Sequence, residues 1–269
     1  MLKLIFSIYR KLFARGGFVK FNNFLFNCSI RGLGIYNYEN MEMSGENAFI
    51  NNYIKKDSLK NNSYIVFDVG ANRGDYTKLI LEKIPDAQIF SFEPHPITYK
   101  ILSQNLIKLK KVRLFNCALS SEKGCLELYD YKSQDGSSHA SLNAEVFTVA
   151  HNSETVSHKV EVSTVDLICE KNNIEKIDFL KIDVEGYELD VLKGSKYMID
   201  NDKVKFIQFE FTQLNTTTRL YFKDFWELLA NKYKIYRLLP NDLLEIKNYS
   251  PTGNEIFGYQ NFVAIHKGI

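Results

Sequence analysis

The chain has 269 residues, of which 45% are hydrophobic and 25% charged, and its formal net charge is +2. This composition suits one large α/β domain, alone or with an arm, and it argues against a disordered chain or a nucleic-acid binder. The four scattered cysteines form no C-x-x-C pair, which argues against a disulfide framework or a cysteine zinc site and favours a reducing, cytoplasmic location.

Residues 1–60 are rich in Asn and aromatic side chains and are predicted to form an irregular N-terminal arm before a domain of residues 61–269. Residues 1–38 contain six Lys and Arg residues and no acidic residue. The apolar run Leu4–Ile8 is too short for a membrane span and lacks the features of a signal peptide. The arm should begin with an amphipathic helix. We expect this helix to pack on the domain or on a second subunit, with peripheral contact to an anionic membrane as the alternative.

The domain begins with a regular alternation of short apolar runs and helical patterns. Strands are predicted at 64–69, 88–92 and 112–117, with helices at 75–84 and 96–109 between them. Strand and helix alternating in this way indicate an α/β fold with a parallel sheet and right-handed crossovers.

The second half continues with less regular spacing. Further strands are predicted at 125–129, 159–165, 178–183, 204–211, 234–239 and 259–266, and helices at 165–172, 187–199 and 218–231. Residues 130–157 have no clear period, and so long an irregular loop in a compact domain is usually functional or mobile. We expect about seven core strands.

The loop after the first strand is the most informative segment. Gly70 and Gly74 are expected to let the backbone approach a ligand, and the helix that follows exposes N–H groups suited to a carboxylate. A Walker loop is excluded because no Lys-Ser/Thr pair follows Gly74, and a dinucleotide loop lacks one glycine, with Asn72 near the place of the pyrophosphate. S-adenosylmethionine fits better, with Asp68 holding its ammonium group directly or through water.

Two later strand ends extend this expected donor site. Glu93 follows the second strand, where a carboxylate can accept hydrogen bonds from both ribose hydroxyls, although NAD enzymes use the same device. The structural alternative is a solvated strand-end carboxylate. Cys117 and Ala118, after the third strand, are expected either to flank an adenine or to be plain core and turn residues.

A second acidic cluster follows the strand at 178–183. Asp183 is the candidate general base or orienting group, with Glu185 as a helper. The alternative is that Glu188 caps the next helix and Asp183 has a structural role. Gly186 should break the strand. Hard oxygen ligands also suit Mg²⁺, but no fourth ligand is evident, so a metal is not favoured.

Two further side chains are candidate helpers. Glu210 ends the strand at 204–211 on the same side of the sheet. His139 lies in the irregular loop, and a lone histidine is a weak signal; His158, His151 and His266 are weaker still.

At these motifs the sequence resembles the FkbM family of methyltransferases. The matching segments are FDVGANRGDYT (67–77), FEPHP (92–96), NCALS (116–120), STVDLI (163–168), DFLKIDVEGYELDVLKG (178–194) and FIQFEF (206–211). The resemblance implies a class I Rossmann-like fold with helices on both faces of a mostly parallel, seven-stranded sheet, whose last strand is antiparallel. It also implies S-adenosylmethionine as methyl donor. The donor-binding residues implied by the resemblance are Asp68, Gly70, Asn72, Gly74, Glu93, Ala118 and Asp183. We expect Ala71, Tyr76, Pro94 and Cys117 to complete the donor site.

The expected reaction is methylation of a hydroxyl on a sugar, a glycan precursor or a related natural product. An N-methyltransferase on a small amine or phospho-amine would use the same donor site, and a non-catalytic S-adenosylmethionine-binding module would keep the fold. A short-chain NAD oxidoreductase would need the missing glycine and a Tyr-x-x-x-Lys pair. The expected partners are a small-molecule or glycan acceptor and no nucleic acid, with membrane contact or self-association through the arm.

Overall fold

The computed structural model describes residues 1–60, 63–133, 135–136 and 154–269. Its main sheet has eight strands in the order β10-β9-β11-β8-β7-β1-β2-β3. The strands are β1 (Tyr64–Val69), β2 (Ala87–Phe92), β3 (Val112–Phe115), β7 (Ile177–Ile182), β8 (Val204–Phe211), β9 (Tyr233–Leu238), β10 (Leu243–Ile246) and β11 (Gln260–His266). The seven expected core strands are all in this sheet, and β10 is an unpredicted eighth strand at its edge.

The order of the strands determines where a ligand can bind. Strands β3, β2, β1, β7 and β8 pair in parallel, whereas β11 is antiparallel to both β8 and β9, which confirms the expected last strand. The chain builds outward from β1 through β2 to β3 and then returns to add β7 on the other side of β1. Ligands in open α/β sheets bind at such a switch point, beyond the carboxyl ends of the strands.

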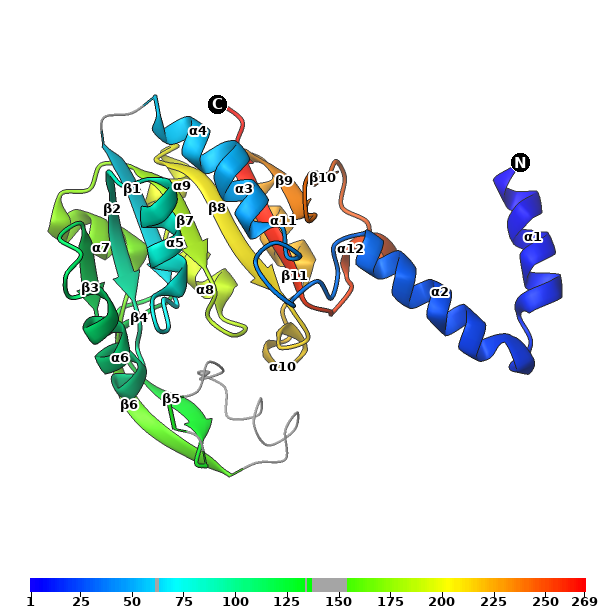
Figure 1. The fold of residues 1–269 in the computed structure, drawn as a ribbon, viewed down its shortest axis with the longest axis horizontal. Coiled ribbons are helices and arrows are strands. Elements are labelled where there is room, and N and C mark those ends of the chain that lie inside the picture. The colour runs from blue at the N-terminus through cyan, green and yellow to red at the C-terminus, as the bar shows by residue number, and fades with distance from the viewer. Residues whose placement is uncertain (61–62, 134, 137–153) are drawn as a thin grey trace.

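Helices cover both faces of the sheet (Figure 1). One face carries α3 (Glu46–Phe49), η2 (Ile50–Ile54), α4 (Lys55–Ser58), α5 (Asp75–Lys83) and α6 (Pro96–Leu106), and the other carries α7 (Val165–Asn172), α8 (Glu188–Lys193), α9 (Lys196–Asp200) and α11 (Phe222–Leu229). A hydrophobic core lies on each face of the sheet, and alternate residues of a strand point into one core or the other. In β1, Tyr64 and Val66 pack toward α3 and α5, while Phe67 and Val69 pack toward α7 and α8. The same alternation turns Asp68 toward the α3–α5 face.

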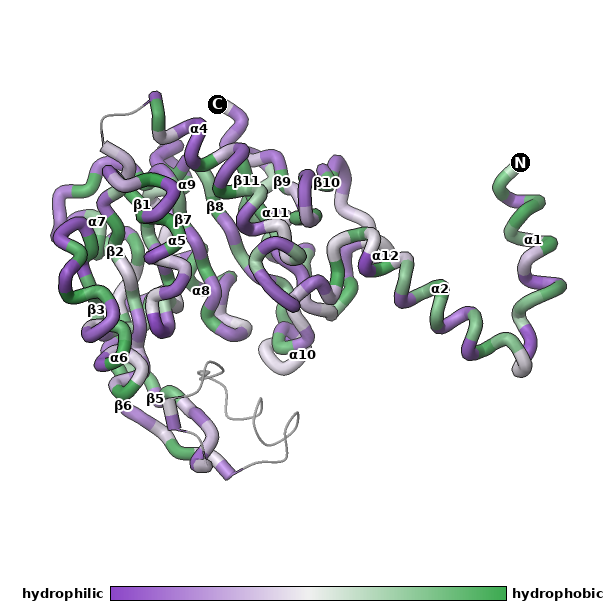
Figure 2. The backbone as a smooth tube through the Cα atoms, viewed as in Figure 1, coloured by the Kyte–Doolittle hydropathy of each residue, from purple (hydrophilic) through white to green (hydrophobic). Residues whose placement is uncertain are grey.

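Residues 2–32 and 46–58 are mostly helical, so the expectation of an irregular arm is wrong for them, and the helix expected at the start of the arm is confirmed. Helix α1 (Leu2–Phe13), the short η1 (Gly16–Phe18) and α2 (Val19–Gly32) extend away from the domain, as Figures 1 and 2 show. No residue of α1 is buried, whereas Phe49 and Ile50 lie in the core beneath the sheet face. Of the helices that the structure describes, none is long and apolar enough to cross a membrane.

A smaller sheet lies beside the main one. It consists of β4 (Ala118–Leu119), β6 (Thr155–Ser163) and β5 (Gly124–Tyr131), in the order β4-β6-β5. The strands expected at 125–129 and 159–165 are thus confirmed, and they belong to this separate sheet. Two short helices, α10 (Asn215–Thr218) and α12 (Pro251–Asn254), complete the described elements.

Candidate active site

The loop after β1 is shaped by contacts with the strand beside it. Gly70 has φ of 80°, and a Cβ built there would lie 1.7 Å from the Asp183 carbonyl oxygen. The Asp183 N–H donates to the carbonyl of Val69 at 3.0 Å, which holds the two strand ends together. At Gly74, with φ of 89°, a Cβ would meet the side chains of Leu102 and Leu106. Gly70 is therefore required by a backbone contact, whereas a side chain at position 74 would displace two leucine side chains. Approach of a ligand to these glycines stays a prediction.

Glu93 bonds this loop to the loop after β2. Its Oε2 accepts from the Asn72 N–H and its Oε1 from the His95 N–H, both at 2.9 Å. The side chain is 6% exposed, so the alternative of a solvated strand-end carboxylate is wrong. Burial raises the pKa of Glu93 to about 7, against the opposing effect of these two hydrogen bonds. Each carboxylate oxygen can still accept a second hydrogen bond.

Asp68 lies behind the loop. It is fully buried, and its Oδ2 accepts from the Thr77 hydroxyl at 2.6 Å. Its Oδ1 lies 3.6 Å from Lys181 Nζ. Lys181 lines the cavity described below, whereas Asp68 does not, so Asp68 influences that cavity through its ion pair with Lys181.

A cavity of about 450 Å³ opens at the carboxyl ends of β1, β7 and β8. Its lining includes six of the predicted site residues, namely Gly70, Ala71, Asn72, Tyr76, Asp183 and Glu210. It also includes Met41, Glu46, Arg73, Asp75, Lys181 and Tyr259, which the sequence did not single out as site residues. The residues of the predicted donor loop and of the predicted base therefore share one cavity.

Lys181 is a buried cation among the acidic groups of this cavity. Lys181 Nζ lies 3.1 Å from Asp183 Oδ2 and 5.0 Å from the centre of the Tyr76 ring. Burial alone lowers the pKa of Lys181, but the charges of Asp183, Asp68 and Glu46 outweigh it and hold the pKa above its usual value. Lys181 is thus a permanent cation that orients the Asp183 carboxylate.

Two further carboxyl groups in the cavity are harder to ionise. Burial and the neighbouring charges of Asp183 and Glu185 raise the pKa of Glu210 well above its ordinary value. Burial also raises the pKa of Glu46, even though this side chain accepts hydrogen bonds from Ser44 and Gln208. The cavity therefore combines Lys181-bound Asp183 with carboxyl groups that favour the protonated form.

The turn after β7 is closed by Glu188. Its Oε1 accepts from the N–H groups of Val184 and Gly186, both at 3.1 Å. These groups precede α8, whose N-cap is Tyr187, so Glu188 closes the turn and does not cap the helix. Gly186 has φ of 99°, but β7 already ends at Ile182, so the expectation that Gly186 breaks the strand is wrong. Glu185 is half-buried in this turn and does not line the cavity.

Cys117 and Ala118 are buried where the main sheet meets the small one. Cys117 belongs to the main core, and burial raises the pKa of its thiol to about 11. Ala118 packs against Leu128 and Val162 of the small sheet. Asn116 holds the neighbouring loop, because its amide donates to the carbonyls of Glu93 and Pro94 at 2.9 and 3.0 Å. These contacts support the core alternative, and adenine contact by Cys117 and Ala118 stays a prediction.

Residues 68–238 match the model of the Methyltransferase FkbM domain. The chain belongs to the FkbM methyltransferase family.

Relatives of this FkbM protein come from fungi, bacteria and archaea. It is 33% identical over 161 residues to methyltransferase sdnD of Sordaria araneosa, a match that covers 51% of this chain and 62% of that protein. It is 26% identical over 155 residues to the 2-O-methyltransferase NoeI of Sinorhizobium fredii, covering 55% and 63% of the two chains. It is 28% identical over 131 residues to the hexuronic acid methyltransferase AglP of Haloferax volcanii, covering 48% and 49%. The match thus spans less than two thirds of the length of each of these relatives.

Among solved structures, a SAM-dependent O-methyltransferase from Thermotoga maritima aligns with a TM-score of 0.38 and 11% identity, covering 80% of this chain and 64% of the other.

Of the candidate histidines of the FkbM protein, His158 and His266 lie within the described residues. His139 and His151 lie outside the described residues. His158 is on β6, where its Nε2 lies 2.8 Å from Asp135 Oδ1, and His266 pairs with Asp202 at 3.1 Å. None of the described histidines lines the cavity at the strand carboxyl ends.

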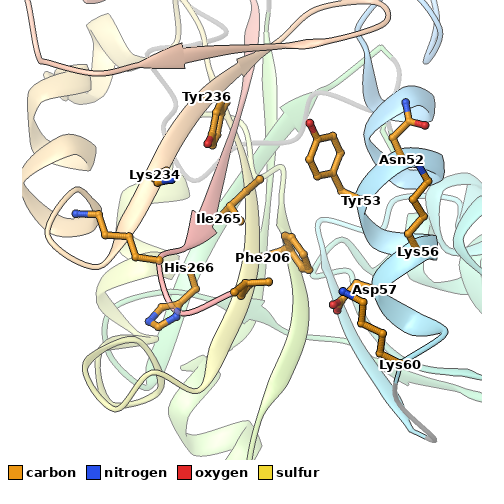
Figure 3. Close-up of a pocket in the computed structure, with 12 residues that line it drawn as sticks. Asn52, Tyr53, Lys56, Asp57, Lys60, Phe206, Lys234, Tyr236, Ile265 and His266 are labelled. Carbon is orange, nitrogen blue, oxygen red and sulfur yellow. The ribbon is translucent and has the colours of Figure 1, made fainter.

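A second cavity of about 400 Å³ lies at the opposite end of the sheet (Figure 3). It is bounded by η2 and α4 on one side and by Phe206, Tyr236 and Ile265 of the strands on the other. Four lysines line it, and of the residues considered as site candidates it contains His266, one of the weaker ones. It is therefore separate from the site that the strand ends define.

Of the cavity residues that the sequence analysis missed, Arg73, Asp75 and Lys181 lie within or beside the motifs, whereas Met41, Glu46 and Tyr259 lie far from them in the chain. Glu46 stands at the start of α3, and Tyr259 directly precedes β11. Neither lies in a recognisable motif. The only available signal was Lys181, whose charge in an otherwise apolar strand should have suggested a buried acidic partner.

Proposed function

We propose that this FkbM-family protein transfers a methyl group from S-adenosylmethionine to a hydroxyl of a sugar, a glycan precursor or a related natural product. The observation that carries the proposal is the cavity in which the Gly70–Arg73 loop faces Asp183, Glu210 and Lys181. The names of NoeI and AglP, a 2-O-methyltransferase and a hexuronic acid methyltransferase, support a sugar-type acceptor.

The residues present fit such a donor. The cavity of about 450 Å³ can hold part of a ligand of this size, and it borders the loop whose following helix exposes N–H groups for a carboxylate. Glu93, bound to that loop through Asn72, is the proposed partner of the ribose hydroxyls. Cys117 and Ala118, beside the Glu93–Pro94 loop, are the proposed adenine contacts. Asp68 is proposed to act indirectly, because Lys181 stands between it and the cavity.

The bound donor supplies an activated sulfonium methyl group, so the protein has to align the acceptor and remove one proton. Asp183 is the proposed base. The acceptor oxygen forms a bond to the methyl carbon as the sulfur–carbon bond breaks, and the hydroxyl proton passes to the Asp183 carboxylate. Lys181 holds that carboxylate in place, and Glu210, with its raised pKa, can donate a hydrogen bond to another acceptor oxygen.

Donor binding tests the proposal first. Replacing Glu93→Ala should weaken calorimetric binding of S-adenosylhomocysteine by about 10- to 100-fold, because a hydrogen bond to a charged group contributes about 1.5–3 kcal/mol. Glu82→Ala on the exposed side of α5 is the control and should bind normally. Thermal unfolding shows whether the Glu93 variant is folded. A folded Glu93→Ala protein with wild-type affinity would remove Glu93 from the site, and no binding by the wild type would defeat the proposal.

The base is tested by turnover. Asp183→Asn should reduce kcat by about 10²- to 10⁴-fold while donor affinity changes only a few-fold, since general base catalysis contributes that much. Asp190→Asn, which disturbs an ion pair with Lys193 on α8, is the matched control and should leave kcat unchanged. Wild-type turnover in Asp183→Asn would exclude this role.

A small amine is the second candidate acceptor. The carboxyl groups of Glu46, Asp183 and Glu210 face one cavity, and their oxygen atoms can accept hydrogen bonds from an amine. Transfer of an isotopically labelled methyl group to matched panels of sugars and amines decides between the two acceptors.

For the arm we propose contact with an anionic membrane surface. Helix α1 contains no buried residue, so its apolar face, with Leu4, Ile5 and Ile8, is open. Its charged residues are all basic, and the chain beyond residue 38 has a net charge of −4. Apolar and basic side chains on one exposed helix suit adsorption to anionic lipid.

A further inference from the structure

Two histidines and an aspartate from three separate segments meet outside the acidic cavity. His95 precedes α6, Asp135 follows β5, and His158 lies on β6. Asp135 Oδ1 lies 3.0 Å from His95 Nε2 and 2.8 Å from His158 Nε2. The three potential ligand atoms all lie within 4.8 Å of one another.

We propose that His95, Asp135 and His158 bind one divalent transition-metal ion of the Zn²⁺ class. Zinc takes imidazole nitrogens at about 2.0–2.1 Å and carboxylate oxygens at about 2.0–2.2 Å, so tetrahedral ligand atoms lie roughly 3.3 Å apart. The observed separations of 2.8 and 3.0 Å need only a small outward shift to admit the ion. Two imidazoles exclude Mg²⁺ and Ca²⁺ as the preferred ions, since those take oxygen ligands.

The surroundings hold the three ligands in a defined position. The His95 side chain is fully buried, and its Nδ1 has no hydrogen-bond partner in the described structure. Asp130, also fully buried, has Oδ2 at 3.5 Å from His95 Nε2 and accepts the Gly136 N–H at 2.8 Å. Asp130 thereby fixes the turn that presents Asp135. Asp135 and His158 are 29% and 23% exposed, which leaves a path for an ion and for a water as fourth ligand.

A metal ion bound at this site would have a structural role, because it would link two parts of the fold. The His95 N–H is bonded to Glu93 Oε1, whereas Asp135 lies in the turn after β5 and His158 lies on β6 of the small sheet. An ion bound here would tie the small sheet to the loop that carries Glu93. None of its ligands lines the acidic cavity, so this site is separate from the proposed base.

Metal binding to the full chain tests the proposal directly. After removal of any affinity tag and dialysis against a chelator, the protein is titrated with ZnCl₂ by calorimetry and with CoCl₂ by visible absorption. We expect one ion per chain, a tetrahedral Co²⁺ spectrum, and a higher Tm with Zn²⁺. His158→Ala should lower the affinity by about 100-fold or more and lose the Tm increase.

The matched control is His266→Ala, which removes the histidine of the simple His266–Asp202 pair and should change none of these readouts. Asp135→Asn provides a second variant if His158→Ala does not fold, and it should also lose tight binding. Wild-type protein that binds no ion stoichiometrically, or a folded ligand variant that binds as wild type does, would overturn the proposal. These readouts do not involve methyl transfer, so they are independent of the proposed function.

Discussion

At the residue scale, Gly70 and Gly74 share a left-handed backbone but face different neighbours. The atom opposing a Cβ at Gly70 is the backbone carbonyl of Asp183, which cannot move without separating β1 from β7. The atoms opposing a Cβ at Gly74 are the ends of the Leu102 and Leu106 side chains, which can rotate. Position 70 should therefore tolerate no side chain, and position 74 should tolerate a small one at moderate cost.

We expect Gly70→Ala to lower the free energy of unfolding by more than about 3 kcal/mol and Gly74→Ala by about 1–2 kcal/mol, the latter mainly for the left-handed backbone. Urea unfolding of both variants measures the difference. Gly17→Ala, with nothing near the new methyl group, serves as the control. Equal losses at positions 70 and 74 would contradict the assigned backbone contact.

At the element scale, α8 begins with a carboxyl group that burial makes reluctant to ionise. Burial raises the pKa of Glu188 from 4.5 to about 7, and the hydrogen bonds from Gly186 and Val184 only partly oppose this. The folded state therefore favours the protonated form. Its contribution to stability is complete below about pH 4.5 and is lost as the pH rises through about 7.

Glu188→Gln should remove this pH dependence. The Gln oxygen can accept the same two N–H groups, and the amide nitrogen replaces Oε2, which has no partner in the described structure. Relative to wild type, the variant should gain about 2 kcal/mol in free energy of unfolding between pH 5 and pH 8. Urea unfolding at the two pH values measures this gain, with Glu227→Gln on the exposed side of α11 as the control. A flat difference across this range would show that Glu188 ionises normally.

At the scale of the whole molecule, the arm and the domain differ in exposure and charge. The arm presents apolar and basic side chains on α1, while the domain keeps its apolar residues in two cores around the sheet. The full chain should therefore bind vesicles that contain phosphatidylserine more tightly than neutral vesicles, and added salt should weaken this binding.

Replacing Arg10→Gln together with Lys11→Gln should reduce partitioning onto anionic vesicles by roughly 30-fold, since each basic residue near the surface contributes about 1 kcal/mol. The matched control replaces Lys108→Gln and Lys110→Gln, two exposed lysines of the domain. Vesicle sedimentation reports the binding. Equal loss from both pairs, or concentration-dependent dimers without vesicle binding in sedimentation experiments, would refute the membrane contact and favour self-association.

Much of the fold could be predicted from the sequence, because strand and helix periods are local properties of the chain. The seven main strands were expected near their observed positions, and Glu93, Asp183 and Glu210 could be assigned to strand ends. The first helix of the arm was expected, but the later ones were missed because the scattered Asn and aromatic residues of 1–60 concealed them. The edge strand β10 was missed because four residues are too few to show a period.

The sequence by itself determined the order of strands and helices, the glycine loop after β1 and the family, since each is written in contiguous residues. Only the tertiary structure decided that Glu46 and Tyr259 join Asp183 in one cavity and that His95, Asp135 and His158 meet. Those encounters join segments far apart in the chain. They depend on how the helices and the small sheet pack on the main sheet, and no local pattern encodes that packing.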